Sequence, residues 1–155
     1  MQLSLVAVGK LRPAYREVCD DYLRRLRRFA RISEREVREA GRSDTEKLQR
    51  DLEGTRLLAA IADDSQVVLL DLDGATWSSE KLAKQLEGWQ LDGRERTFVI
   101  GGAAGVSAAV RARAATSWSL GPLTLPHELA RVVVAEQLYR ASTILRGEPY
   151  HRGAR

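Results

Sequence analysis

Cysteine and histidine are scarce in this sequence of 155 residues, and their scarcity excludes two kinds of small protein. The single cysteine, Cys19, rules out an internal disulfide framework. The two histidines, His127 and His151, leave too few ligands for a Cys/His zinc cluster. We therefore expect a metal-free protein, and the chain is long enough to bury a proper core without such cross-links.

Long apolar runs are absent as well. No segment of the sequence is apolar over the length needed to span a bilayer, and the N-terminus lacks the basic-then-apolar pattern of a signal peptide. We therefore expect a cytoplasmic protein without membrane contact. The length fits one domain over residues 1–155, because no linker or repeat divides the chain.

The net charge is slightly positive, at +4, from 25 basic and 21 acidic residues. This excess favours an anionic partner such as nucleic acid, although a solvated basic surface explains the same charge. Five arginines cluster in the first quarter of the chain, at Arg24, Arg25, Arg27, Arg28 and Arg31.

Segments typical of strands and helices alternate along the chain. Strands are expected at residues 3–8, 32–37, 67–70, 97–100 and 118–120. Helices are expected from Pro13, Ser43, Ser78 or Ser79, Ser107 and His127. This alternation predicts an α/β fold with a mostly parallel sheet flanked by helices on both faces.

Three local expectations follow from the residues in these segments. The helix after Ser43, where Ser43 and Glu46 resemble a capping box, should pack through Leu48, Leu52 and Leu58 and be weakened by Gly54. The buried strand at 67–70 should end in a loop at 71–74. The last helix carries a second apolar flank, which suggests a partner subunit; this flank consists of Leu129, Val133 and Ile144.

Two strand–loop–helix corners follow one another between residues 97 and 140. The first has Gly101, Gly102 and Gly105 after the strand at 97–100, and the second has a loop at 121–126 before the last helix. Loops of this kind place backbone N–H groups at the carboxyl edge of a parallel sheet, where α/β proteins bind cofactors. We therefore expect one small ligand to be held between the two loops.

Common catalytic motifs do not match these loops. The glycine spacing differs from the dinucleotide fingerprint, and neither a phosphate-binding P-loop nor a serine nucleophile elbow is present. Cys19 lies in an apolar helical stripe and His127 precedes a helix, so structural roles suit both. His151, in the Pro149–Arg152 tail, is the more interesting candidate. The residues alone predict a small α/β domain with cofactor loops and a basic surface.

Four blocks of sequence carry a resemblance to a known family. They read LLDLDG followed by a tryptophan, FVIGGAAG, SWSL with LTLPHELARVVVAEQLYRA, and PYHR. In this order they resemble the RlmH family of SPOUT-class methyltransferases, and the N-terminal LSLVAVGKLRPAY is similar as well. The family usually has Gly-Gly-Pro-Glu-Gly in the glycine loop, where this sequence has Ala103 and Ala104.

The resemblance implies a SPOUT-type fold with a C-terminal trefoil knot, a homodimer, and S-adenosylmethionine as cofactor. It implies methylation of N3 of a pseudouridine in large-subunit (23S) ribosomal RNA, presented as free RNA, as the large subunit or in the assembled ribosome. The implied cofactor-binding residues are Leu70, Asp71, Leu72, Gly101, Gly102, Gly121, Pro122, Leu123, Thr124, Leu125 and Pro126. His151 and Arg140 are the catalytic candidates. Arg131, Tyr150 and Arg152 are the candidates for positioning RNA.

Two other function classes remain open at this point. An enzyme that uses a nucleotide cofactor on small metabolites predicts no dependence on RNA. A non-catalytic RNA-binding module predicts affinity for RNA without cofactor binding. Titration with S-adenosylmethionine separates the second class from the enzymes.

Overall fold

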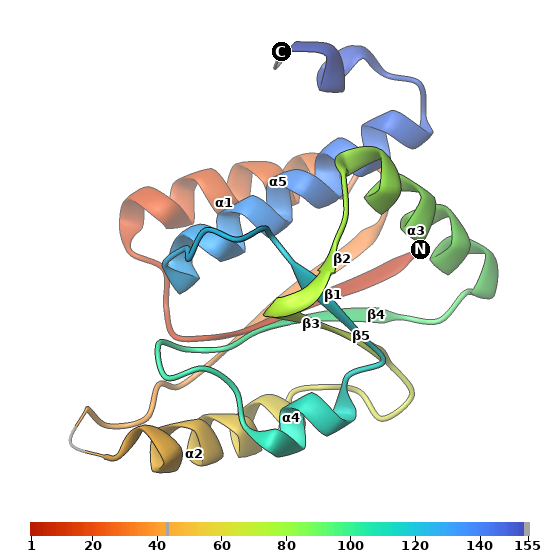
Figure 1. The fold of residues 1–155 in the computed structure, drawn as a ribbon. Coiled ribbons are helices and arrows are strands. Elements are labelled where there is room, and N and C mark those ends of the chain that lie inside the picture. The colour runs from red at the N-terminus through yellow and green to blue at the C-terminus, as the bar shows by residue number, and fades with distance from the viewer. Residues whose placement is uncertain (43, 154–155) are drawn as a thin grey trace.

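A computed structural model describes residues 1–42 and 44–153, which form one five-stranded sheet with helices on both faces (Figure 1). The strands are β1 Gln2–Val8, β2 Arg31–Val37, β3 Gln66–Thr76, β4 Arg96–Ile100 and β5 Thr116–Ser119. The helices are α1 Pro13–Leu26, α2 Glu46–Ala59, α3 Ser79–Asp92, α4 Ala108–Arg113 and α5 His127–Leu145, followed by the 3₁₀ helix η1 Pro149–Gly153.

The sheet is parallel at every pairing, in the order β2-β1-β4-β3-β5. Helices α1, α3 and α5 cover one face, and α2 and α4 cover the other (Figure 1). This arrangement confirms the predicted α/β class. Within the described part of the chain, no helix is both long and apolar enough to cross a membrane.

Strand β1 shows why the central strands read as continuous apolar runs. Its Leu3 and Leu5 face the core beneath α1, α3 and α5, whereas Val6 and Val8 face the core beneath α2 and α4. All four side chains are almost completely buried. Successive side chains in a strand point to opposite faces, so a strand covered on both sides needs apolar residues throughout. Strand β2 lies at the edge of the sheet, and its residues are exposed or half-buried.

Helix boundaries follow local capping chemistry, with one correction. Ser78 accepts a hydrogen bond from the backbone of Lys81, and α3 ends at Gly93, whose φ of 72° suits glycine. The hydroxyl of Thr45 caps α2 by accepting from the backbone N–H of Leu48, 3.2 Å away. The capping prediction placed on Ser43 falls on a residue outside the described ranges, and the cap observed is Thr45.

The expected apolar face of α2 is partly wrong. Leu58 packs against the core beneath α2 and α4, but Leu48 and Leu52 are exposed, and the helix instead turns Gly54 and Leu57 inward. Gly54 does not interrupt the helix, because its missing side chain makes room for Ser107, against which a Cβ atom would overlap. Contact with α4 therefore decides which face of α2 is buried.

The loop expected at 71–74 coincides with an interruption of the ladder between β3 and β5. The strand is assigned as far as Thr76, but Leu70 and Ala75 both pair with Trp118, so residues 71–74 leave the ladder. We call this excursion the bulge of β3. It places Asp71 beside the carboxyl ends of the neighbouring strands.

Helix α5 lies packed between α1 and α3 on the sheet (Figure 1). Its inner face buries Val134, Leu138 and Ala141. The predicted second flank of Leu129, Val133 and Ile144 is half-buried. Ile144 packs against the main core, so the neighbouring helices already cover part of the flank that was assigned to a partner.

Candidate functional site

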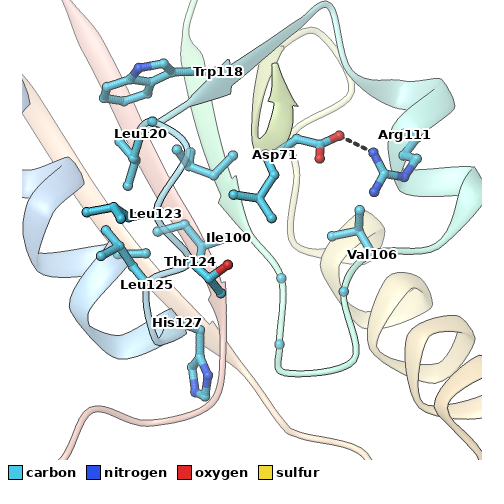
Figure 2. A pocket seen from close by; sticks show the side chains of 17 residues that line it. Asp71, Ile100, Val106, Arg111, Trp118, Leu120, Leu123, Thr124, Leu125 and His127 are labelled. Atoms are coloured by element: carbon cyan, nitrogen blue, oxygen red, sulfur yellow. Dashed lines mark hydrogen bonds and ion pairs between the residues drawn. The ribbon is translucent and has the colours of Figure 1, made fainter. Parts of the chain in front are cut away.

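A pocket opens at the carboxyl ends of β3, β4 and β5, where three segments far apart in sequence meet (Figure 2). They are the bulge of β3, the glycine loop after β4, and the loop from Leu120 to the start of α5. The cavity measures about 280 Å³, which is close to the lower limit of small-molecule sites. The parallel sheet explains its position, since all three strands end at this edge.

Most residues predicted from the sequence to bind a cofactor line this pocket. Those that do so are Leu70, Asp71, Leu72, Gly101, Gly102, Gly121, Leu123, Thr124 and Leu125. Pro122 and Pro126 are not among the lining residues. The structure thus brings the three predicted loops together, and the prolines shape their loop without facing the cavity.

Gly105 of the predicted glycine loop also lines the pocket. Sequence reasoning missed seven other lining residues, which are Ile100, Val106, Arg111, Trp118, Leu120, His127 and Ala130. Most are neighbours of predicted residues or belong to the same strand ends. Arg111 is different, because it comes from the middle of α4 and no sequence pattern marked it. Only the packing of α4 beside the bulge of β3 brings it to the pocket.

Asp71 and Arg111 form an ion pair on the side of the pocket opposite Leu123 and Leu125 (Figure 2). The Asp71 side chain is mostly shielded from solvent, at 12% exposure, whereas that of Arg111 is 49% exposed. The remaining lining is apolar or glycine apart from Thr124 and His127. The pocket therefore has an apolar side and a charged side.

The glycine loop packs tightly against the interior of the protein. A Cβ atom on Gly102 would lie 2.8 Å from Oε1 of Glu53 and 3.1 Å from Cγ1 of Val8. Glu53 is itself buried and holds the backbone N–H of Ala40 through Oε2, while its Oε1 has no partner in the described structure. A side chain at position 102 would therefore crowd Glu53 of α2 and Val8 of β1.

The C-terminal tail lies at the other end of α5 from the pocket (Figure 1). The ring of Tyr150 packs on Tyr139 with centroids 4.6 Å apart, and its hydroxyl donates to Oε1 of Glu136 at 3.0 Å. Burial, together with the neighbours Tyr22 and Glu136, raises the pKa of Tyr150 well above its usual value. The tail therefore packs against α5 of its own chain.

Arg140 and His151, the catalytic candidates, both lie near this tail. Arg140 pairs with Glu136 at 2.7 Å, and its guanidinium carbon stands 4.9 Å from the centroid of the Tyr150 ring. Burial opposes the charge of Arg140, but the hydrogen bond and the negative charge of Glu136 outweigh it and raise its pKa. Nδ1 of His151 lies 3.0 Å from the carbonyl oxygen of Glu148. Arg152 is exposed.

Arg131 does not belong with the RNA-contacting candidates. Its side chain is completely buried and donates to the carbonyl oxygens of Val8 and Gly9. It also pairs with Glu34 and Glu36 of β2. A guanidinium committed to these four partners in the interior has no surface to offer a phosphate, so we withdraw Arg131 from that set.

The pocket and the tail are separated by the length of α5. A helix of 19 residues spans about 28 Å at 1.5 Å per residue. The start of α5 lines the pocket, and its end leads into the tail. One chain therefore does not bring its own tail to its own pocket.

Across the described residues, no group of three or more His, Cys, Asp or Glu side chains is placed to hold a metal.

Comparison with known proteins agrees with this geometry. The family model described as "Predicted SPOUT methyltransferase" matches residues 1–151. The curated "Ribosomal RNA large subunit methyltransferase H" of Methylococcus capsulatus is 46% identical over 155 residues, covering 98% of this chain and 100% of that protein.

A solved structure supports the fold independently. It is that of a probable methylase family protein from Haemophilus influenzae Rd KW20, with a TM-score of 0.54 and 12% identity. The match covers 94% of this chain and 66% of the other. The fold, the pocket at the carboxyl edge and a match that runs almost from end to end lead to one conclusion: the chain belongs to the SPOUT methyltransferase family, in its RlmH branch.

Proposed function

We propose that this methyltransferase transfers a methyl group from S-adenosylmethionine to N3 of a pseudouridine in large-subunit ribosomal RNA. The observation that supports this most is the pocket built from three loops at the carboxyl edge of the sheet. The curated relative, whose name states the ribosomal RNA of the large subunit, matches along its whole length. Because the proposed substrate is ribosomal RNA, we expect the protein in the cytoplasm.

The pocket has the features that S-adenosylmethionine requires. Leu120, Leu123 and Leu125 offer apolar surface for an adenine ring, and Gly121, with a φ of 117°, bends the loop backbone around the cavity. Asp71 and Arg111 offer charges of both signs for a zwitterionic group. When bound, the cofactor supplies a methyl group on a positively charged sulfur.

The work left to the protein is to align donor and acceptor and to manage the proton on N3 of the base. Alignment of reactants alone lowers the barrier by several kcal/mol. We assign proton removal, or stabilisation of the resulting anion, to His151 and Arg140. Tyr150 offers an aromatic face to an unpaired base, and the exposed Arg152 offers its charge to a phosphate.

These roles require two chains. Because the tail and the pocket of one chain lie at opposite ends of α5, we propose a homodimer in which the tail of one protomer meets the pocket of the other. An isologous dimer would create two such shared sites. The trefoil knot implied by the family resemblance stays a prediction.

Two measurements test the proposed activity. Calorimetry should detect binding of S-adenosylmethionine, and transfer of labelled methyl should then be assayed on 23S RNA, large subunits and assembled ribosomes. Modification of one pseudouridine at N3 in at least one of these substrates is the expected result. Cofactor binding without transfer to any of them would overturn the proposed substrate.

Complementation between variants tests the shared site. Ala130→Phe should fill the pocket, and His151→Ala should disable the tail, so each homodimer should lose activity. A mixed dimer holds one site with an intact pocket and an intact tail. Mixing the two variants should therefore restore part of the activity, whereas no recovery after confirmed subunit exchange would contradict the shared site.

A further inference from the structure

Asp71 and Arg111 carry the fixed charges in the lining of the pocket, and the rest of the described lining offers only Thr124 and His127 as polar side chains. The two residues are 40 positions apart in sequence, on β3 and α4. The bulge of β3 turns Asp71 towards the cavity, and α4 presents Arg111 across from it (Figure 2). A pair of opposite charges is thus built into one side of an otherwise apolar cavity.

Fold stability is a weak explanation for this pair. An ion pair with one exposed partner contributes little to stability, and the Arg111 side chain is 49% exposed. The core beside it is formed by apolar residues such as Val99 and Val110, which pack without its help. Among the described residues, the Arg111 guanidinium pairs with Asp71 and lines the pocket, where a ligand can reach it.

The pair matches the chemistry of an amino acid. An α-ammonium and an α-carboxylate are opposite charges a short distance apart, and they can each replace one member of an ion pair. A guanidinium binds a carboxylate through two parallel N–H donors, which gives direction as well as attraction. The mostly shielded Asp71 carboxylate accepts hydrogen bonds from an ammonium in the same way.

We propose that Asp71 and Arg111 form the subsite for the amino-acid end of S-adenosylmethionine, with Asp71 holding its ammonium and Arg111 its carboxylate. This inference rests on the proposed function. The two residues exchange their mutual contact for contacts with the ligand when it enters. The apolar loop at 120–125 is left to the adenine at the other side of the pocket.

Three ligands provide the test. S-Adenosylmethionine has the charged sulfonium and the amino-acid end. S-Adenosylhomocysteine keeps the amino-acid end but has a neutral sulfur without the methyl, and 5′-methylthioadenosine has a neutral sulfur and no amino-acid end, so the last two isolate the amino-acid end. Binding of each is measured by calorimetry to the wild-type protein, Arg111→Gln and Asp71→Asn. We expect both variants to lose roughly 10- to 100-fold in affinity for the first two ligands, and less than about threefold for 5′-methylthioadenosine.

Matched controls separate this role from general electrostatics. Asp73→Asn removes an exposed carboxylate from the same bulge and should leave all three affinities unchanged. Arg111→Lys keeps the charge but loses the paired donors, so it should recover only part of the affinity. Melting temperatures of all variants should stay close to that of the wild-type protein.

The outcomes are distinct. Equal losses for all three ligands would overturn the inference, because the pair would then support the pocket as a whole. A loss at Asp71→Asn confined to S-adenosylmethionine would also overturn it, by assigning Asp71 to the sulfonium. Wild-type binding with no effect of either variant would refute this subsite alone, whereas a wild-type protein that binds none of the ligands would refute the proposed function.

Discussion

The guanidinium of Arg131 donates a hydrogen bond to the carbonyl oxygen of Gly9 at 2.8 Å and so links α5 to the end of β1. Arg131 belongs to α5, whereas Gly9 directly follows β1. The same guanidinium pairs with Glu34 and Glu36 on β2. A single buried side chain thus joins the helix that leads from pocket to tail to two strands of the sheet.

Replacement of Arg131 should destabilise the protein strongly. Arg131→Ala leaves two carbonyl oxygens and part of the carboxylate charge of Glu34 and Glu36 without their partner. We expect a loss of about 3 kcal/mol in the free energy of unfolding, measured by urea denaturation. Arg12→Ala, which removes an exposed partner of Glu128, should change the free energy of unfolding far less. Similar costs for both variants would contradict the structural role of Arg131.

Two helical glycines should respond to alanine in opposite directions. Gly54→Ala places a Cβ atom against Ser107 and should destabilise the contact between α2 and α4. Gly88→Ala, in α3, meets nothing within 4 Å and should stabilise the protein by about 0.5–1 kcal/mol. Thermal melting compares the two variants, and a stabilising Gly54→Ala would show that α4 does not pack as described.

The glycine loop and Glu53 should be coupled energetically. Gly102→Ala forces a Cβ atom towards Glu53, so it should lower both the stability and the affinity for S-adenosylmethionine. Removing the other side chain with Glu53→Ala relieves that collision, although it also frees the backbone N–H of Ala40. A double-mutant cycle should therefore give a coupling of about 1 kcal/mol or more. Additive effects would mean that the loop avoids Glu53.

We expect Tyr150 to stabilise the fold and the residues after it to serve methyl transfer, so two truncations should have different effects. Removing residues 151–155 keeps Tyr150 on Tyr139 and should abolish methyl transfer with little change in melting temperature. Removing residues 150–155 also exposes Tyr139 and takes the hydroxyl from Glu136, so it should lower the melting temperature as well. Full activity of the shorter truncation would place the proton-removing group elsewhere.

Cys19 should be unreactive in the folded protein. Burial, followed by the nearby charge of Glu34, raises the pKa of its thiol from 9.0 to about 12. Native protein should therefore resist iodoacetamide at pH 8.5, and unfolded protein should react. The raised pKa also gives stability that is fully present below pH 9 and is lost as the pH rises towards about 12, because the unfolded thiol ionises first. Rapid alkylation of native protein would contradict this burial.

Periodicity and capping in the sequence predicted most of the fold. Continuous apolar runs revealed strands buried on both faces, and Pro13 and Ser107 marked helix starts correctly. The failures share a cause. The inward face of α2 depends on α4, and the bulge at Asp71 depends on β5. Neither partner is local in sequence, so no local pattern carries the information.

In the site too, local patterns predicted some residues, whereas others depend on packing between distant segments. Glycines after β4 pointed to the pocket, because strand ends in a parallel sheet share an edge. The sequence did not mark Arg111 as a pocket residue, and the buried Arg131 was assigned to RNA. An arginine on a helix looks the same in sequence whether it is buried, paired in a pocket or exposed. Only packing decides among these environments.

The strand order has a consequence for when the protein becomes functional during its synthesis. Strand β3 lies between β4 and β5 in the sheet, and both of these strands follow it in the sequence. The sheet is therefore complete only after the last two strands have been synthesised. The pocket draws on residues as late as Ala130. A nascent chain shorter than this has no place to bind a methyl donor, and long-range parallel pairings of this kind form slowly. The enzyme therefore acquires its cofactor only after nearly all of its chain has left the ribosome.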